Sequence, residues 1–285
     1  MDNNLKRAWR IISPVVFYLI IERIVGFLIN FYYIMGRLDE DTAWSDALEN
    51  QLYQEIYELQ NDHAILISGV VAVLCIFAFY PMVKKEWTKR SYRIEPLKAC
   101  RLKYFYVAAV SIGFTIAVNL IINAWGMFKH DFDFAKLSQM IYSESIWMQF
   151  LVIGFIVPVC EELIFRGVIY ERIIQSGSQR WAMILTSIIF AFFHGTWIQI
   201  LYAFCFSFLL IYAYHRCGTF FAPVLFHILS NMSSLILRQF PPLSTMGYSI
   251  GIVIFAMLGT GGLYILKKEK FYRKLYKNDS EVSYN

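Results

Sequence analysis

The chain has 285 residues, of which 58% are apolar, 18% aromatic and only 16% charged. Soluble domains are nearer 45 to 50% apolar and about 25% charged, so this composition, with a mean hydropathy of +0.49, indicates a polytopic membrane protein and excludes disorder and a fibrous repeat. The net charge of +5 raises the question of nucleic acid, but the basic clusters border apolar segments, where we expect them to contact lipid headgroups. We therefore expect the bilayer, and no nucleic acid, as a partner.

Eight apolar segments approach the width of a bilayer, which takes about 20 helical residues. They predict an all-α bundle of about eight transmembrane helices with short connections, in one integral membrane domain over residues 1–285. The fifth segment is short, and a tight turn from His194 to Trp197 separates it from the sixth, so its full crossing stays open. The predicted spans are 11–36, 64–83, 104–128, 146–171, 182–196, 197–214, 219–237 and 247–266.

The basic residues predict the orientation, because cytoplasmic loops retain Lys and Arg. With the N-terminus inside, 20 of the 26 basic residues fall in inner segments and four in outer ones. The first outer loop instead carries eight acids between Asp39 and Asp62. We expect both termini to be cytoplasmic, a basic cytoplasmic tail over 267–285, and a location in the plasma membrane, with the first span acting as a signal anchor.

Three charged residues lie within the segment 158–166 of the predicted span 146–171, where a charge costs at least about 2.5 to 3.5 kcal/mol on insertion scales. Glu162 and Arg166 are four residues apart, so a helix places them on one face, and we expect them to neutralise each other. Glu161 is turned about 100° away and is expected to face the bundle interior as a candidate general base. Pro158 removes a backbone hydrogen bond just before these acids and is expected to kink the span.

Two further spans carry polar groups at helical spacing. Phe190 and His194 share one helix face, as do His227 and Asn231 on another. At about 1.5 Å per residue, Glu161 lies roughly 16 Å from the inner edge, His194 roughly 20 Å and His227 roughly 14 Å. A carboxylate, two imidazoles and an amide at one depth predict a hydrolytic site. Any one of these polar side chains, taken alone, would more simply be interpreted as a hydrogen-bonded residue in the packing between helices.

Four other polar residues within the spans receive a structural interpretation. Asn119 and Asn123 lie one turn apart in the third span and are expected to hydrogen-bond between helices. Glu22 and Arg23 lie deep in the first span, and no role is assigned to them beyond pairing or bordering a cavity.

The sequence lacks the motifs of three known classes of intramembrane protease. There is no H-E-x-x-H motif, no G-x-S-x-G motif and no Asp within a predicted span. What remains is E-E-x-x-x-R at 161–166, F-x-x-x-H at 190–194 and H-x-x-x-N at 227–231. In this order the motifs resemble the CPBP family, which includes the type II CAAX prenyl endopeptidases and the Abi proteins linked to bacteriocin processing and self-immunity. The resemblance covers about residues 146–237, the expected protease core.

The resemblance implies an eight-helix intramembrane endopeptidase whose site opens towards the cytoplasm or the lipid. Glu161 would be the general base that activates a water, and His194 would help to hold that water. His227 and Asn231 would stabilise the tetrahedral oxyanion, a task for preorganised donors. The supporting residues would be Glu162, Arg166 and Phe190.

The sequence leaves cofactor use open but favours a site without metal. Glu161, His194 and His227 could supply a zinc site with two histidines, one carboxylate and an open position for water. We favour the metal-free alternative, because no two histidines lie one turn apart on a helix and no second carboxylate that would orient either imidazole can be named.

The substrate class is also left open. A prenylated C-a-a-X protein suits a site of this depth, because its lipid places the scissile bond at the membrane. A short membrane peptide of the bacteriocin or pheromone type suits it equally well. The oligomeric state is not predicted.

Two alternatives belong to other functional classes. The chain could be a non-catalytic membrane scaffold, regulator or self-immunity protein that binds a partner membrane protein, although it retains every motif residue. It could also be a proton-coupled transporter, against which the lack of an inverted repeat counts. Glu161→Gln distinguishes them, because a scaffold tolerates this change and a protease does not.

Overall fold

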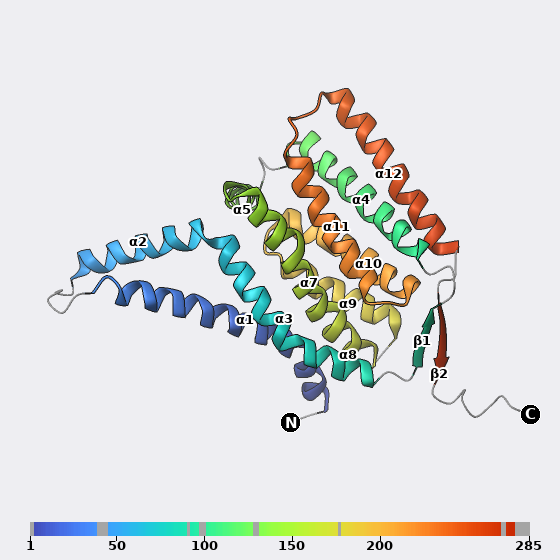
Figure 1. Ribbon diagram of the computed structural model, residues 1–285, viewed down its shortest axis with the longest axis horizontal. Helices are drawn as coiled ribbons and strands as arrows, with labels where there is room; N and C mark the ends of the chain where they lie inside the picture. Colours follow the sequence, from blue (N-terminus) through green and yellow to red (C-terminus); the bar gives the residue numbers. More distant parts are fainter. Residues whose placement is uncertain are drawn as a thin grey trace, which may run out of the picture.

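The computed structural model describes residues 3–38, 45–89, 92–96, 101–127, 131–175, 178–268 and 272–276. Helices dominate, which confirms the all-α prediction, and the α1–α2 pair projects to one side of the bundle (Figure 1). In chain order the elements are α1 Asn3–Met35, α2 Asp46–Asp62, α3 Ala64–Thr88, β1 Tyr92–Pro96, α4 Leu102–Ala124, α5 Phe132–Ser143, α6 Ile146–Met148, η2 Gln149–Ile156, α7 Val157–Glu162, η3 Leu163–Tyr170, α8 Glu171–Ile174, α9 Gln179–Phe192, α10 Trp197–Cys217, α11 Phe221–Arg238, α12 Thr245–Lys268 and β2 Tyr272–Tyr276.

Seven helical segments of the described chain are long and apolar enough to cross a membrane, and the protein is an integral membrane protein. One of them is the continuous rod from α6 to α8, called the motif helix below. The predicted span 182–196 falls short, because α9 has only 14 residues. It ends where Gly195 adopts a φ of +81°, and the Thr196 hydroxyl then accepts a hydrogen bond from the Gln199 N–H to begin α10.

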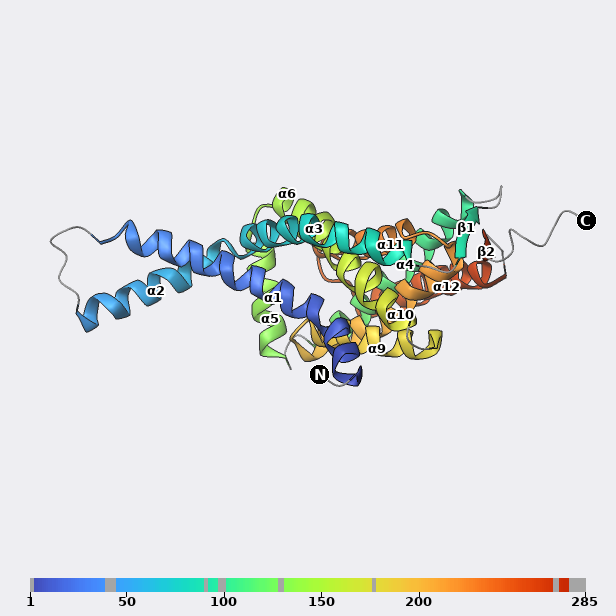
Figure 2. The same cartoon turned by 90° about the horizontal axis from the view of Figure 1, so that it is seen from below.

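The expectation of short connections is wrong, because both long loops that were predicted to lie outside contain helices. The Ser45 hydroxyl caps α2, and the Asp131 carboxylate caps α5 by accepting from the Phe134 N–H. Figure 2 shows α5 crossing the thickness of the bundle, crosswise to α3. A two-stranded antiparallel sheet of β1 and β2, in which Tyr92 pairs with Tyr276, was also not predicted. Of the expected tail over 267–285, residues 269–271 and 277–285 lie outside the described residues.

The two helices α4 and α12 pack closely because glycines face each other. A Cβ atom added at Gly113 would lie 2.4 Å from the Gly259 nitrogen, so the backbones themselves are in contact there. Gly262 continues this face against Val110. Small residues allow such an approach, which is how helices associate in a membrane without a hydrophobic driving force. On its other side α4 packs against α11, and this three-helix layer forms one wall of the site described below (Figure 1).

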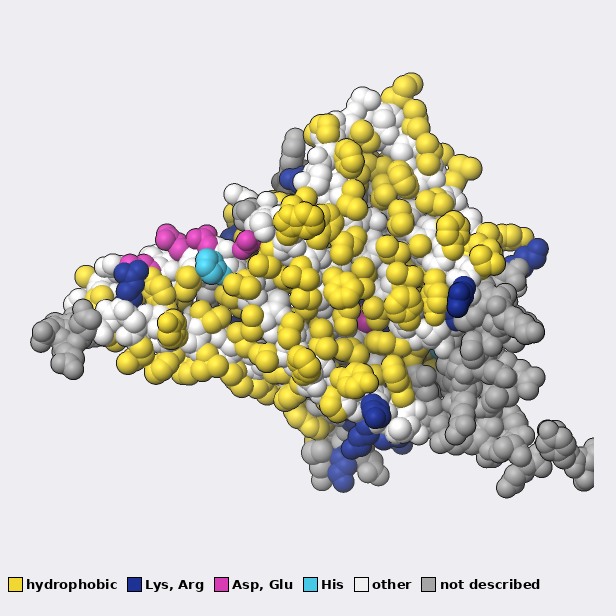
Figure 3. Space-filling model, in the orientation of Figure 1, with side chains coloured by type: hydrophobic (Ala, Val, Ile, Leu, Met, Phe, Trp, Pro, Cys, Tyr) yellow, Lys and Arg dark blue, Asp and Glu magenta, His cyan; other side chains and the backbone are white. Residues whose placement is uncertain are grey.

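The predicted inner ends of the helices meet in a charged cluster around Glu86, near the end of α3. This side chain is 2% exposed. It accepts hydrogen bonds from Arg10 at 2.9 Å, Lys89 at 3.0 Å and Arg172 at 3.0 Å, and so joins α1 and α3 to the motif helix. Basic side chains gather at this edge of the molecule, whereas acidic side chains cover α2 at the far edge (Figure 3). The contacts of Glu86 therefore bring together the ends of α1, α3 and the motif helix that are predicted to lie inside.

Candidate functional site

The motif helix is not a regular α-helix. Two π-helical stretches, η2 and η3, flank the single α-helical segment α7 that carries Glu161 and Glu162. The Val157 N–H bonds to the Val152 carbonyl, a bond of the wider π type, directly before Pro158, which has no N–H to donate. A kink was expected at Pro158. The structure has instead a change from π-helical to α-helical hydrogen bonding at this position. Short π segments occur frequently at functional sites.

The predicted pair of Glu162 and Arg166 is confirmed. The Arg166 Nη1 atom donates to Glu162 Oε1 at 2.8 Å, and both side chains are fully buried. The second Nη atom of Arg166 donates to the Ser207 hydroxyl of α10 at 2.8 Å, and the guanidinium lies 4.3 Å from the centre of the Phe190 ring. A hydrogen bond, an ion pair and a cation–π contact therefore fix this arginine.

His227 links the two acids of the motif helix to α11. Its Nδ1 atom lies 2.8 Å from Glu162 Oε1, and its Nε2 atom lies 3.6 Å from Glu161 Oε2. Because an ionised carboxylate only accepts, Nδ1 is the donor in the first contact. Glu162 thus orients this imidazole, so the expectation that no second carboxylate would do so is wrong. Sequence spacing gave no signal for it, because the two residues are 65 positions apart.

His194 lies beyond the end of α9, against its motif partner. Its Nδ1 atom is 2.9 Å from the Phe190 carbonyl oxygen, and the two rings are 4.7 Å apart, which confirms that they share a face. A carbonyl oxygen only accepts, so Nδ1 carries the hydrogen and the neutral ring keeps Nε2 as an acceptor. The rings of His194 and His227 both pack against Phe190, at centroid distances of 4.7 and 5.8 Å.

A cavity of about 270 Å³ joins the four candidate catalytic residues. Glu161, His194, His227 and Asn231 all line it, and the Glu161 side chain is 14% exposed. The Asn231 amide donates one hydrogen bond to the Ile153 carbonyl at 2.8 Å, which holds α11 against the motif helix. The structure therefore brings together every residue that the three motifs nominated.

Several residues of this site were not predicted from the sequence. Ser207 is the partner of Arg166, and Gln199, Tyr202 and Tyr142 line the cavity. Tyr142 belongs to α5, and burial raises the pKa of its phenol above the ordinary value. A signal for α5 was present, because apolar or small residues recur at helical spacing through this segment, at 134, 137, 138, 141 and 142.

The structural roles expected for four other polar residues are met in part. Asn119 donates to the Ser234 hydroxyl of α11 at 3.1 Å, which confirms an interhelical bond, whereas Asn123 bonds to its own helix at the Asn119 carbonyl. Glu22 and Arg23 are both exposed on α1 and form no ion pair with each other. Neither lines the cavity.

The residues do not fit a three-ligand zinc site in this arrangement. Across the described ranges, no three side chains of His, Cys, Asp or Glu lie close enough together to hold a metal ion. Glu161, His194 and His227 line one cavity but do not form such a group.

Comparisons with known proteins cover this same region. The sequence model of the family described as "Type II CAAX prenyl endopeptidase Rce1-like" matches residues 143–233. The chain is also 26% identical over 176 residues, 59% of its length, to the UPF0177 protein YaiF of Lactococcus lactis subsp. lactis (strain IL1403), of which the match covers 75%. No solved structure matches the chain. The segment that the family model matches contains all three motifs and both Glu161 and Glu162, so the similarity to the Rce1-like type II CAAX prenyl endopeptidases lies in the residues that form the site.

Proposed function

We propose that the protein is an intramembrane endopeptidase that hydrolyses a peptide bond within or near the membrane. The observation that carries the proposal is the position of Glu161. This carboxylate lines a cavity inside an apolar bundle, 3.6 Å from an imidazole whose other nitrogen is held by a second carboxylate. A carboxylate and oriented imidazoles around one cavity are the groups that general acid–base hydrolysis requires.

In the proposed reaction Glu161 takes a proton from a water molecule, and the oxygen of that water attacks the carbonyl carbon of the scissile bond. The Nε2 atom of His194 accepts a hydrogen bond from the same water. Protonated His227 and the second N–H of Asn231 donate to the oxyanion of the tetrahedral intermediate. Glu161 then gives its proton to the leaving amine as the C–N bond breaks, so the carboxylate is regenerated.

The first test is peptide cleavage by purified protein in nanodiscs. A farnesylated C-a-a-X peptide, its unprenylated twin and a short apolar membrane peptide are each offered to wild type and to Glu161→Gln. We expect cleavage of at least one peptide by wild type and its loss in the variant. The isosteric amide cannot act as a base, and general base catalysis contributes about 10² to 10⁴ in rate.

Glu58→Gln is the matched control for this test. It removes an exposed carboxylate on α2, outside the cavity, and should cleave like wild type. Equal cleavage by Glu161→Gln and wild type would refute the proposed role of Glu161. A wild-type protein that cleaves none of the three peptides while folded would favour the scaffold alternative.

Metal dependence is tested on the same preparation. We expect the cleavage rate to be unchanged after chelation and dialysis, because the proposed steps use the chain's own groups alone. Stoichiometric zinc that is lost together with activity would contradict this mechanism.

A further inference from the structure

The cavity lies mainly in one half of the bundle. On the motif helix it is lined by Ile153, Val157 and Glu161, and by no described residue after Glu161. On α10 its lining runs from Gln199 to Leu210, and on α4 from Thr115 to Ile122. Most of these positions lie in the half predicted to be outside, away from the Glu86 cluster and the β1–β2 sheet, whereas Leu210 on α10 and His227 on α11 lie past the middle of their helices. The cavity therefore extends mainly outward from Glu161, which lies near its inner end.

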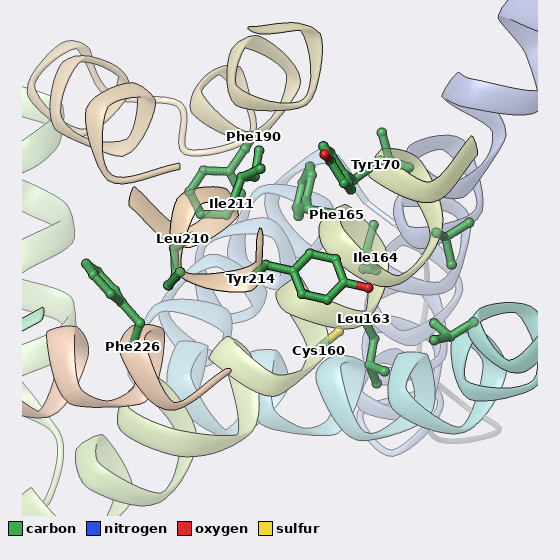
Figure 4. Close-up of a cluster of buried hydrophobic side chains, with 14 of the residues drawn as sticks. Cys160, Leu163, Ile164, Phe165, Tyr170, Phe190, Leu210, Ile211, Tyr214 and Phe226 are labelled. Carbon is green, nitrogen blue, oxygen red and sulfur yellow. The ribbon is translucent and has the colours of Figure 1, made fainter. Parts of the chain in front are cut away.

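The inner half of the bundle is filled with packed side chains. Directly below the two acids, Arg166, Phe165 and Ile164 are 0% exposed. Figure 4 shows the rings and aliphatic chains of the next layer, including Tyr214 and Ile211, filling the space between the motif helix and α10. A substrate that approached Glu161 from the inner side would have to displace this layer, so the packing favours access from the opposite direction.

The short helix α5 covers the outer end of the cavity. Its apolar face, which includes Leu137, Ile141 and Tyr142, forms part of the lining. The Asp131 carboxylate accepts hydrogen bonds from the N–H groups of Phe134, at the start of α5, and of Ile198, at the start of α10, at 2.9 and 3.1 Å. The Asp131 carboxylate thus joins the start of α5 to the start of α10, at the predicted outer surface.

Two further contacts of α5 involve the exposed side chains of Lys136 and Arg238. Lys136 donates to the Tyr57 phenol of α2 at 2.7 Å, and the Arg238 guanidinium lies 5.0 Å from the ring of Tyr142. Solvent-exposed polar contacts contribute little each, of order 1 kcal/mol or less. Breaking a few of them is a small cost compared with disrupting the packed inner half.

The cavity wall is uncharged apart from the candidate catalytic groups. Of the described residues that line it, none is Lys, Arg or Asp. Hydroxyl and amide groups on α4 and α11 form a continuous polar strip along one wall, where Thr115 and Asn119 donate to Ser230 and Ser234 at 3.0 and 3.1 Å. Such a wall can bond to a peptide backbone, but the described lining residues include no Lys or Arg that would neutralise the free carboxylate of a substrate.

From these observations, and resting on the endopeptidase function proposed above, we propose that the substrate reaches Glu161 from the outer half of the membrane, beneath α5. The substrate class is then a peptide segment in, or exported to, the outer leaflet, with uncharged side chains beside the scissile bond. A prenylated C-terminus presented from the cytoplasm does not suit a cavity that is closed on that side.

The test measures access to the cavity by thiol labelling, which does not require activity. Ser234→Cys and Val118→Cys each place a thiol on the cavity wall, and Ser233→Cys is the matched control, because Ser233 is buried next to Ser234 but does not line the cavity. A membrane-impermeant thiol reagent is added to spheroplasts and to inside-out vesicles from the same cells, with the parent protein as background. A tag after Asn285 reports the orientation of the chain.

We expect both cavity cysteines to react from the spheroplast side, severalfold faster than Ser233→Cys, and not from inside-out vesicles. Asp131→Ala, which removes the carboxylate that joins α5 to α10, should speed this reaction further. Labelling only from inside-out vesicles would overturn the inference, as would a lack of labelling from outside even with Asp131→Ala. Because Glu161→Gln should label like its parent, failure of this inference is distinguishable from failure of the proposed reaction.

Discussion

Glu162 connects the charged pair to the candidate catalytic groups, because a single oxygen atom of its carboxylate serves two partners. Oε1 accepts from Arg166 and from His227, both at 2.8 Å. The other oxygen, Oε2, is buried and has no hydrogen-bond partner among the described residues. Arg166 therefore acts on the site through Glu162 and His227, and its own side chain does not line the cavity.

Arg166→Ala should mainly cost stability. The change leaves a fully buried carboxylate without its compensating charge, and breaking a buried pair costs about 3–5 kcal/mol. Thermal unfolding in detergent measures the loss. Ser207→Ala, which removes only one hydrogen bond from the same guanidinium, should cost less, about 1.5–3 kcal/mol. Normal thermal stability of Arg166→Ala together with absent cleavage would show that this assignment is wrong.

His194→Ala and His227→Ala should each abolish most of the cleavage while leaving the protein folded. Both rings line the cavity with one nitrogen already bonded to the protein, so each presents the other to a reacting group. A positioned acid or base contributes about 10² to 10⁴ in rate. Cleavage assays and thermal unfolding on the same samples measure both effects. His63→Ala, an exposed residue at the start of α3, is the control, and a similar loss of activity there would contradict a site-specific effect.

Among the elements, the α4–α12 pair depends most directly on residue size. Gly113 meets the backbone of α12 at Gly259 and Phe255, and a backbone cannot rotate away as a side chain can. Because α4 also carries Thr115 and Asn119 of the cavity wall, its separation from α12 influences the position of that wall.

Gly113→Ala should therefore destabilise the protein. The added Cβ would lie 2.7 Å from the Phe255 carbonyl oxygen, and overpacking of this kind costs about 1–3 kcal/mol. Gly261→Ala is the matched control on α12, because its Cβ would meet nothing within 4 Å. Thermal unfolding of the two variants in the same detergent should separate them, and equal midpoints would refute the close approach of α4 and α12.

At the scale of the whole molecule, the Glu86 cluster holds together the helix ends that lie opposite the cavity. It joins Arg10 of α1, Lys89 after α3 and Arg172 of the motif helix, which are far apart in the sequence. Arg172 also donates to the Arg10 carbonyl at 2.6 Å. This end of the bundle is therefore fixed, which suits a site that opens at the other end.

Glu86→Ala should lower the stability of the bundle by about 1–3 kcal/mol, because hydrogen bonds to a buried charged group are lost from three cations at once. Thermal unfolding again provides the measurement. Lys89→Ala removes one partly exposed partner and should change stability by no more than about 0.5 kcal/mol. If the two variants unfold alike, the cluster does not act as a single unit.

The sequence by itself determined the fold class, seven of the eight predicted spans and the faces on which the motif residues lie. These properties depend on local periodicity and on the cost of burying a charge in lipid, both of which are properties of neighbouring residues. The same reasoning predicted the pairing of Glu162 with Arg166, one helical turn away.

Only the tertiary structure decided what crosses from one helix to another. The bond between Glu162 and His227, the contact of Arg166 with Ser207, the cover that α5 forms and the end at which the bundle is hollow were not predicted. Each depends on distances between segments that are 40 or more residues apart. Helical periodicity specifies which face of a helix is polar, but the neighbour that this face meets is set by how all the helices pack.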